Sequence, residues 1–220
     1  MTGSVDAILV GELRSCRQEE SCSGGACYRG ICTGLVDADA LWLQQQLGDR
    51  LLARVEGDQA ARDDLLAKLG AIALAPTRAA LVRSRAVAFS ARLGGERAVE
   101  LLRTASGDAE APVRYRALLG LASLGHGDVV ADLAPLAEDP SEPVRAELAR
   151  SLGPAGTEEA VHLLRALAER DDAAAVRIAA VRALGQSPVP SARDALEAIT
   201  AGGPGYLHHD AVVALRGARN

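Results

Sequence analysis

The segment Glu138–Arg145, which reads EDPSEPVR, decides the fold of this chain because close copies of it recur at a regular spacing. The segment SGDAEAPVR ends at Arg114, and the segment RDDAAAVR ends at Arg177. The Val-Arg pairs that end these three segments, together with Val82-Arg83, stand 31, 31 and 32 residues apart. A period between about 20 and 50 residues is typical of repeat arrays, in which each unit packs against its neighbours.

Other positions keep the same phase. Ala or Leu stands four residues after each Val, Leu usually stands eight residues after it, and Gly stands twelve residues after it in three units. Apolar residues at this spacing share one face of a helix, and Gly readily adopts the left-handed backbone that often ends one. Each unit is therefore predicted to be a helix, a turn with Gly and a second helix. The columns comprise Ala86, Ala117, Leu148, Ala180 and Ala211; Leu121, Leu152, Leu184 and Leu215; and Gly94, Gly125 and Gly156.

The composition agrees with this prediction. Hydrophobic residues make up 49% of the 220 residues but aromatic residues only 2%, so the core must consist mainly of Ala, Leu and Val. Such a core favours closely packed helices over a β-sandwich. The net charge of −5 argues against a nucleic-acid partner, and no apolar run approaches the ~20 residues of a membrane helix. The first residues, MTGSVDAILVGEL, do not match a signal peptide.

In its repeated Asp, Val-Arg, Ala, Leu and Gly columns the chain resembles HEAT-like repeats, in the short form found in phycobilisome lyases and many bacterial proteins. The likeness is clearest over residues 76–199. We predict an all-α fold, an α-solenoid of about five HEAT-like helix pairs over residues 37–220, preceded by a small disulfide-linked module over residues 1–36. Residues 40–73 have helical patterning without the Val-Arg signature, and we interpret them as an atypical N-terminal cap.

The last copy of the repeat, GYLHHDAVVALRGARN, is expected to supply one helix without a partner helix. An incomplete unit leaves part of its apolar face uncovered. We expect this edge, with Ala211, Val212 and Leu215, to be either the place of a missing cap or a surface for self-association.

All four cysteines, Cys16, Cys22, Cys27 and Cys32, lie within seventeen positions near the start of the chain. The segment around them is rich in Gly, Ser and charge, so burial alone cannot fold it and cross-links must supply its structure. We predict two disulfides and, among the three pairings, favour Cys16–Cys27 with Cys22–Cys32. A zinc site is the first alternative, although it usually has C-x2-C spacing and no His lies nearby. Unlinked thiols are the second alternative.

This cysteine pattern resembles short four-cysteine modules of secreted and envelope proteins in some bacteria. The resemblance implies an oxidising compartment, which is periplasmic, in the cell envelope or extracellular. We presume that a signal segment has been removed from the sequence in hand. Reduced cysteines would instead indicate the cytoplasm.

An acidic residue precedes the Arg of three repeats by six positions. Asp near the start of a helix can cap its free N–H groups, and it can also pair with an Arg of its own or a neighbouring repeat. We interpret these residues as a structural ladder between repeats rather than as a phosphate site. The ladder comprises Asp108, Arg114, Asp139, Arg145, Asp171 and Arg177.

Enzymes with this architecture exist, but the chain lacks their residues. Deoxyhypusine hydroxylase holds two irons with His-Glu pairs, and none of the four His residues here is followed by Glu. DNA glycosylases of this fold use aromatic residues and a basic face, whereas Trp42 is the only Trp here. The residues His208, His209 and Asp210 are expected to be exposed or to pair within the array. We therefore predict no catalytic, metal or cofactor site.

In arrays of this family the second helix of each unit usually lines the concave face. There we expect a protein or peptide partner, because the exposed positions carry mixed charge. We predict a non-enzymatic scaffold or adaptor that works outside the cytoplasm. One alternative is a HEAT-like lyase or maturation factor acting on a cofactor-bearing or modified protein, and another is a cytosolic scaffold stabilised by zinc. The expected contact residues are Glu100, Arg103, His162, Arg165, Asp194 and Glu197.

Overall fold

The computed structural model describes residues 26–28, 31–33, 49, 52–125 and 129–217. The chain divides into two compact units, Met1–Ala98 and Val99–Asn220. Helices account for most of the described residues, and the fold is the all-α solenoid of helix pairs that the sequence predicts. No helix among the described residues is long and apolar enough to cross a membrane.

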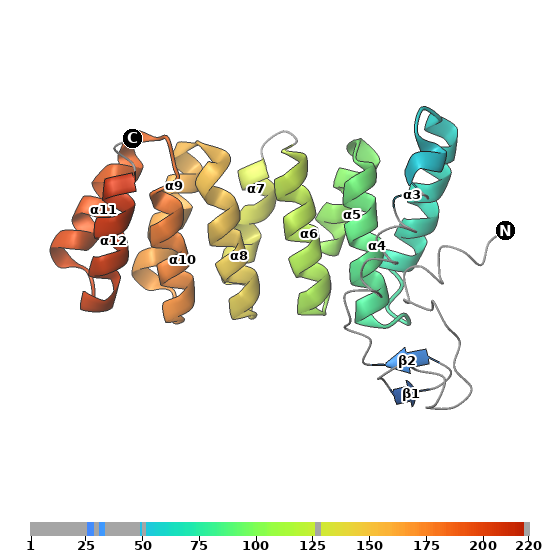
Figure 1. Cartoon of the computed structure of the whole chain (residues 1–220), viewed down its shortest axis with the longest axis horizontal. Helices are drawn as coiled ribbons and strands as arrows, with labels where there is room; N and C mark the ends of the chain where they lie inside the picture. The colour runs from blue at the N-terminus through green and yellow to red at the C-terminus, as the bar shows by residue number, and fades with distance from the viewer. Residues whose placement is uncertain (1–25, 29–30, 34–48, 50–51, 126–128, 218–220) are drawn as a thin grey trace. The chain divides into compact units, whose positions relative to one another are not determined.

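The first unit contains a small hairpin and a helix pair. Strands β1 (Ala26–Tyr28) and β2 (Ile31–Thr33) are antiparallel and place the Cα atoms of Cys27 and Cys32 opposite each other. Helix α3 (Gln59–Ala73) lies beside α4 (Ala80–Leu93) in Figure 1 and packs against it. Both helices contribute fully buried apolar side chains. The two helices therefore form a local apolar core. The repeat pattern predicts this core for α4, which carries the Val-Arg signature, but not for α3, which lacks it.

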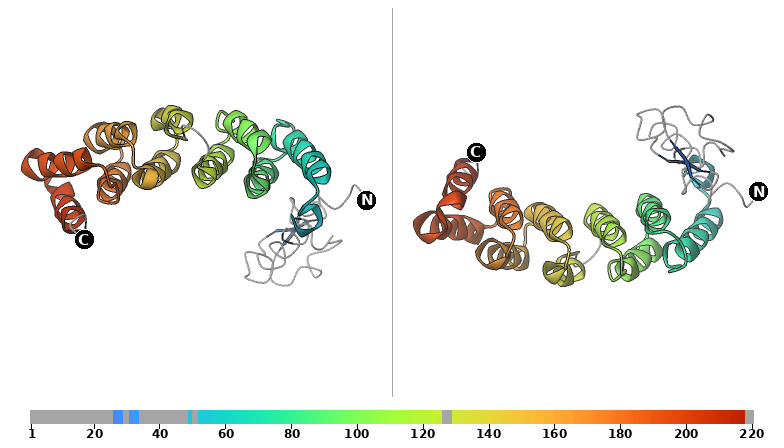
Figure 2. Two further views of the ribbon diagram at one scale, coloured as in Figure 1. Left: turned by 90° about the horizontal axis from the view of Figure 1, so that it is seen from above. Right: turned by 90° about the horizontal axis from the view of Figure 1, so that it is seen from below.

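Helix α5 (Glu96–Ala105) begins in the first unit and ends in the second. In the second unit the helices that carry the Val-Arg column lie side by side, and each contacts the next one along the chain (Figure 1). The helices between them form another row in Figure 2, so that the unit has two layers. The first row comprises α6 (Ala111–Leu124), α8 (Glu142–Leu152), α10 (Ala174–Leu184) and α12 (Gly205–Gly217), and the second comprises α7 (Val129–Leu133) with the 3-10 helix η2 (Ala134–Glu138), α9 (Glu158–Arg170) and α11 (Pro190–Gly202).

The repeated apolar columns form the core of the second unit. Val113, Val144 and Val176 of the three Val-Arg pairs in this unit are at most 1% exposed, and so is Leu207, which takes the place of Val in the last repeat. The predicted left-handed glycines are confirmed at Gly125 and Gly156, with φ of 56° and 66°, whereas Gly94 in the first unit has a φ of 68° with a ψ of −170° and so lies outside the left-handed helical region. Only Gly adopts such a backbone without strain, so these residues allow the chain to turn from the first row to the second.

Two second-layer features differ from a plain helix pair. The apolar stripe predicts one helix through Val130 and Leu136, but α7 ends at Leu133 and η2 follows it. Pro135 has no N–H and cannot continue the α-helical hydrogen bonds, which explains the change to 3-10 geometry. A second 3-10 helix, η3 (Gly153–Ala155), contains Pro154 and lengthens the turn after α8 for the same reason.

Several predictions concern parts of the chain outside the description. The boundary between residues 36 and 37 and the residues Cys16 and Cys22 lie outside the described ranges. For Cys27 and Cys32 the structure describes the backbone alone. The disulfides and the cysteine-rich module therefore stay predictions.

Candidate functional site

Arg114 connects two successive repeats. Its Nε and Nη2 donate to the carboxylate of Asp139, with distances of 2.6 Å to Oδ2 and 2.7 Å to Oδ1. Its Nη1 donates to the backbone carbonyls of Asp108 and Ala109, both at 2.9 Å. A forked guanidinium fits a carboxylate with two parallel hydrogen bonds. The side chain therefore joins the turn before its own helix α6 to the turn before α8.

Arg145 makes the same connection one repeat later. Its Nε and Nη2 donate to Asp171 at 2.7 Å and 2.9 Å, and its Nη1 donates to the carbonyl of Asp139 at 2.8 Å. Asp139 thus accepts from Arg114 through its side chain and from Arg145 through its backbone. Of the six predicted ladder residues, five form one continuous chain of hydrogen bonds, from Asp108 to Asp171.

The aspartates close turns and do not cap helices. The N-cap residues of α8 and α10 are Ser141 and Ala173, and neither helix has a side-chain cap. Instead Asp139 Oδ1 accepts the Ser141 N–H at 2.8 Å, and Asp171 Oδ1 accepts the Ala173 N–H at 2.9 Å. Of the two roles that the sequence allows for these aspartates, the structure shows pairing with an Arg and not capping, because each Asp lies two positions before the N-cap.

Both aspartates are charged at neutral pH. Burial alone raises the pKa of Asp139, but hydrogen bonds from Arg114 and from the Ser141 N–H outweigh it and hold the pKa below its ordinary value. The pKa of Asp171 is lowered in the same way, by Arg145 and the Ala173 N–H against the effect of burial. Each arginine and aspartate therefore form a buried, ionised pair at the junction of two repeats.

Arg177, the sixth ladder residue, has different contacts. Its guanidinium lies over the ring of Tyr206, with 5.3 Å between the guanidinium carbon and the ring centre. Its Nε is enclosed and has no hydrogen-bond partner among the described residues. Among the described residues, the arginine column that joins the inner repeats thus binds no carboxylate at the last repeat.

A groove lies beside the ladder in the second unit. It has a volume of about 500 Å³ and runs between the turn at 137–140 and one side of α9. Leu163, Ala166 and Leu167 form an apolar wall, and the exposed side chains of Glu138 and Arg170 stand at its border. Arg145, Asp171 and Asp172 line it where the ladder crosses. We call this feature the α9 groove.

The six predicted contact residues are all exposed, but none of them lines the α9 groove. Arg103 pairs with Asp132 at 2.8 Å, and Arg165 pairs with Glu169 at 2.7 Å. Glu197 pairs with Arg193 at 3.1 Å on α11, where Asp194 also lies, while Glu100 lies on α5 and His162 on α9. The structure thus spreads these residues over α5, α9 and α11 and does not bring them into one site.

The sequence reasoning missed Leu163, Ala166 and Arg170. Leu163 and Ala166 are only half-buried and lie next to the core stripe of α9, beside His162 and Arg165. In the sequence, the only hint of this wall is a Leu that stands next to the predicted core stripe of the helix. The sequence does not show that residues 137–140 face this Leu.

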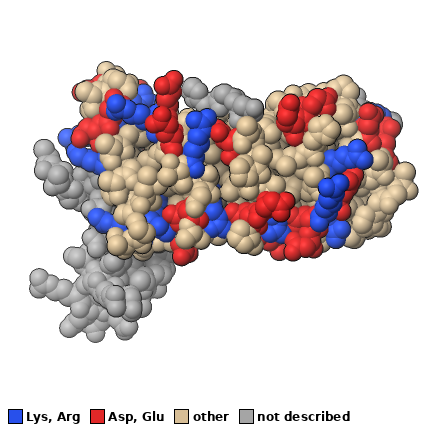
Figure 3. All heavy atoms as spheres, turned by 180° about the vertical axis from the view of Figure 1, so that it is seen from behind, with Lys and Arg blue, Asp and Glu red and all other residues tan. Residues whose placement is uncertain are grey.

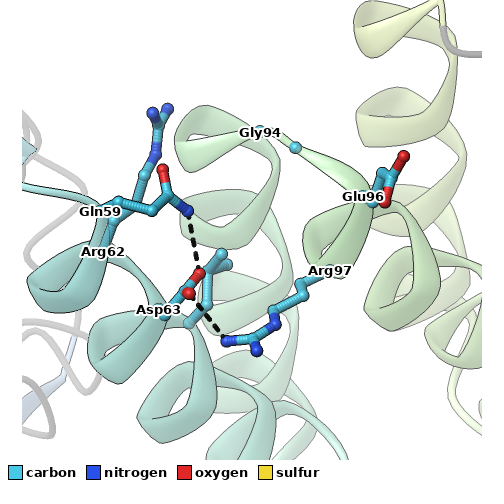
Figure 4. A pocket seen from close by; sticks show the side chains of 8 residues that line it. Gln59, Arg62, Asp63, Gly94, Glu96 and Arg97 are labelled. Carbon is cyan, nitrogen blue, oxygen red and sulfur yellow. Dashed lines mark hydrogen bonds and ion pairs between the residues drawn. The ribbon is translucent and has the colours of Figure 1, made fainter.

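A smaller cavity of about 250 Å³ lies in the first unit, between α3 and the segment from Gly94 to Arg97 (Figure 4). Asp63 accepts from Gln59 Nε2 at 3.1 Å and from Arg97 Nη1 at 3.0 Å across it. Arg62 donates to the carbonyl of Leu93. These side chains bind one another, so the cavity is best explained as part of the packing.

Two polar residues of the last repeat, His208 and Asp210, have partners within the array. His208 Nδ1 lies 3.2 Å from the Thr200 carbonyl, and Asp210 pairs with Arg182 of α10 at 2.8 Å. Within the described residues no group of three or more His, Cys, Asp or Glu side chains could hold a metal ion. Of the predicted apolar edge, Ala211 is buried, and Val212 and Leu215 are half-buried.

Charge is mixed over the surface. Figure 3 shows acidic and basic side chains interspersed on one face of the described residues, without a broad basic area. A nucleic-acid interface usually has such an area. The pattern agrees better with a protein partner.

The sequence profile of HEAT repeats matches residues 104–185 and 130–216, which together span just over half of the chain. The chain therefore belongs to the HEAT-repeat family, a class of proteins that usually binds other proteins. No similar protein was found among curated sequences.

Solved structures with a similar fold include two proteins linked to enzymes. Human deoxyhypusine hydroxylase in complex with glycerol is 23% identical, with a TM-score of 0.51, over 83% of this chain and 75% of that one. The complex of CpcE and CpcF of phycocyanin lyase from Nostoc sp. PCC7120 is 23% identical, with a TM-score of 0.50, over 82% of this chain and 72% of that one. At this level of identity the likeness shows the shared fold and no shared activity.

Proposed function

We propose that this protein is a non-enzymatic scaffold that binds a protein or peptide in the α9 groove. The observation that carries the proposal is the groove itself, in which an apolar wall of α9 stands beside exposed groups of both charges. Its volume of about 500 Å³ falls within the usual range of ligand pockets, which is about 300–1,000 Å³. A peptide side chain of moderate size fits such a space, with polar contacts at the border.

The groups in the groove suit binding better than catalysis. A general acid or base works best when its pKa lies near the operating pH. In the groove the pKa of Asp171 and of Asp139 lies below the ordinary value, because Arg145 and Arg114 hold these carboxylates. Neither carboxylate is therefore available to accept a proton at neutral pH.

The proposed partner site is narrower than the surface expected from the sequence. The exposed residues His162 and Arg165 lie beside the apolar wall on α9 and extend the contact surface. Residues Asp194 and Glu197 of α11 and Glu100 and Arg103 of α5 would contact only a longer partner. A partner whose main contact is the α9 groove, and which also reaches α5 and α11, would contact both the groove residues and the residues expected from the sequence.

A site-specific photocrosslinker tests the binding function. Replacing Ala166, in the groove, by a photoreactive amino acid should yield a cross-linked partner in the native host. The same replacement at Ala201, which is exposed on α11, is the matched control. The partner, once identified, should bind the Arg170→Glu variant at least about tenfold more weakly, because Arg170 stands at the groove border. Equal cross-linking from both positions, or unchanged affinity, would contradict the proposal.

We further propose that the protein works outside the cytoplasm, on the basis of the four clustered cysteines. Intact mass under denaturing, non-reducing conditions distinguishes the alternatives. A mass four hydrogens low, with no alkylation, indicates two disulfides. Four alkylated thiols, with one zinc ion in the native spectrum, would exclude the extracellular proposal and support the zinc-stabilised scaffold.

A further inference from the structure

The hairpin of the first unit brings two of the four cysteines level with each other. Strands β1 and β2 are antiparallel, and Figure 1 shows them side by side. Their register pairs the Cα atoms of Cys27 and Cys32 in the middle rung, next to the rung of Tyr28 and Ile31. The two cysteines therefore occupy directly opposed positions of the backbone.

This register meets the distance requirement of a disulfide. Directly opposed residues of an antiparallel pair lie on the same face of the sheet, with Cα atoms about 4.5 to 5.5 Å apart. A disulfide joins residues whose Cα atoms are about 4.4 to 6.8 Å apart. A bond between Cys27 and Cys32 therefore needs no change in the register of the hairpin.

A bond at this rung also explains how so short a hairpin is held together. Each strand has three residues, and within the described ranges the sheet consists of these two strands. An isolated two-stranded hairpin is at best marginally stable in water. A disulfide across its middle rung stabilises the hairpin, because it removes conformational freedom from the unfolded chain.

We propose that Cys27 and Cys32 form one disulfide and that Cys16 and Cys22 form the other. This pairing replaces the one favoured from the sequence alone. The register gives Cys27 a partner that is already opposite it, whereas any other pairing must bring a cysteine from outside the hairpin, at a greater cost in chain entropy. The inference rests on the proposed extracellular function, because disulfides persist in an oxidising compartment.

The bond forms by exchange with the disulfide of an oxidised thiol oxidoreductase. The Cys27 thiolate attacks this disulfide, and one sulfur of the oxidant leaves as a thiolate. The Cys32 thiolate then attacks the mixed disulfide at the Cys27 sulfur and releases the second sulfur of the oxidant. The two cysteines lose two electrons and two protons in total, and the oxidant becomes a dithiol.

Tryptic mapping of the full chain distinguishes the three pairings, because Arg17 and Arg29 separate the cysteines. Protein from the native host is blocked with N-ethylmaleimide and digested without reductant. A pH of about 6.5 keeps most thiols protonated during digestion, so that exchange between disulfides is slow. The proposed pairing should join three peptides into one product, namely residues 15–17, 18–29 and 30–50.

Electron-transfer fragmentation of this product identifies the pairing. Cleavage of peptide 18–29 between Cys22 and Cys27 should leave peptide 30–50 on the Cys27 side and peptide 15–17 on the Cys22 side. The reverse attachment would show the pairing favoured from the sequence alone. A linked product that lacks peptide 18–29 would show the third pairing. Either of these two results overturns the inference.

Two single variants give an independent measurement. Cys27→Ser should leave one thiol that N-ethylmaleimide labels, and peptide mapping should find the label on Cys32. The matched variant Cys16→Ser should carry the label on Cys22 instead. A label on Cys16 or Cys22 in the Cys27→Ser protein overturns the inference.

The results also separate this inference from the proposed function. Two disulfides in another pairing would overturn the inference and leave the extracellular proposal intact. Four labelled thiols in the wild type would overturn both. Neither result affects binding in the α9 groove, because residues between Ala137 and Asp172 line it.

Discussion

The inner repeats and the last repeat place the same arginine in two environments. Arg114 and Arg145 lie between turns of successive repeats, with side chains 10% and 12% exposed, and each holds a buried aspartate. Arg177 lies in the same column but stacks on Tyr206 and binds no aspartate within the part of the chain that the structure describes. The difference shows that the arginine column joins successive repeats where the next turn carries Asp, and that this pairing is lost where the next turn carries none.

The largest effect is expected from Asp139→Ala. This change leaves Arg114 charged, buried and without its carboxylate, which typically costs about 3–5 kcal/mol of unfolding free energy. Equilibrium urea unfolding, followed by circular dichroism, measures the loss. The double variant Arg114→Leu with Asp139→Leu should recover part of it, because neither charge then stays buried. A loss below about 1 kcal/mol would place the pair among weak surface ion pairs.

Acid should loosen the inner repeats through the same pairs. The pKa of Asp139 and of Asp171 is lower in the folded chain than in the unfolded one. Their stabilisation is therefore complete above the unfolded value, at about pH 4, and is lost as the pH falls through the lower folded values. The unfolding free energy, measured from pH 6 downward, should stay nearly constant until about pH 4 and decrease at lower pH.

The Asp139→Asn variant sharpens this test. It removes one of the two carboxylates whose pKa is lowered in the folded chain, so its unfolding free energy should fall less steeply with acid than that of the wild type. Equal slopes for the two proteins would mean that Asp139 does not contribute to the acid sensitivity. The Arg177 rung, which has no aspartate, should contribute nothing to the slope.

A smaller effect is expected from Tyr206→Ala in the last repeat. It removes the stacking on Arg177, which is worth about 0.5–1 kcal/mol at a partly exposed site. Thermal unfolding should therefore show a decrease well below that of Asp139→Ala. The conservative change Tyr206→Phe should retain most of the stability, because the ring stays. A decrease as large as that of Asp139→Ala would show that the last rung is as structural as the inner ones.

Much of the fold could be predicted from the sequence, because a period near 31 residues and the glycines at 94, 125 and 156 depend only on local rules. The ladder residues could be found in the same way. Their pairing could not, because whether Arg114 meets Asp108 or Asp139 depends on how one repeat is rotated against the next. The sequence also could not show that the turn at 137–140 forms a groove with α9, since that depends on tertiary packing.

The smallest effect is expected from Asp172→Asn, and it is informative because Asp171 is the adjacent residue. Both carboxylates bind Arg145, at 2.6 Å and 2.7 Å, but the side chain of Asp172 is 90% exposed and that of Asp171 only 3%. Water replaces the ion pair of Asp172 at little cost, so its loss should change the unfolding free energy by less than about 0.5 kcal/mol. Asp171→Asn should cost several times more, because burial removes that replacement. Equal effects in urea unfolding would show that the distance to Arg145, and not burial, sets the strength of a rung.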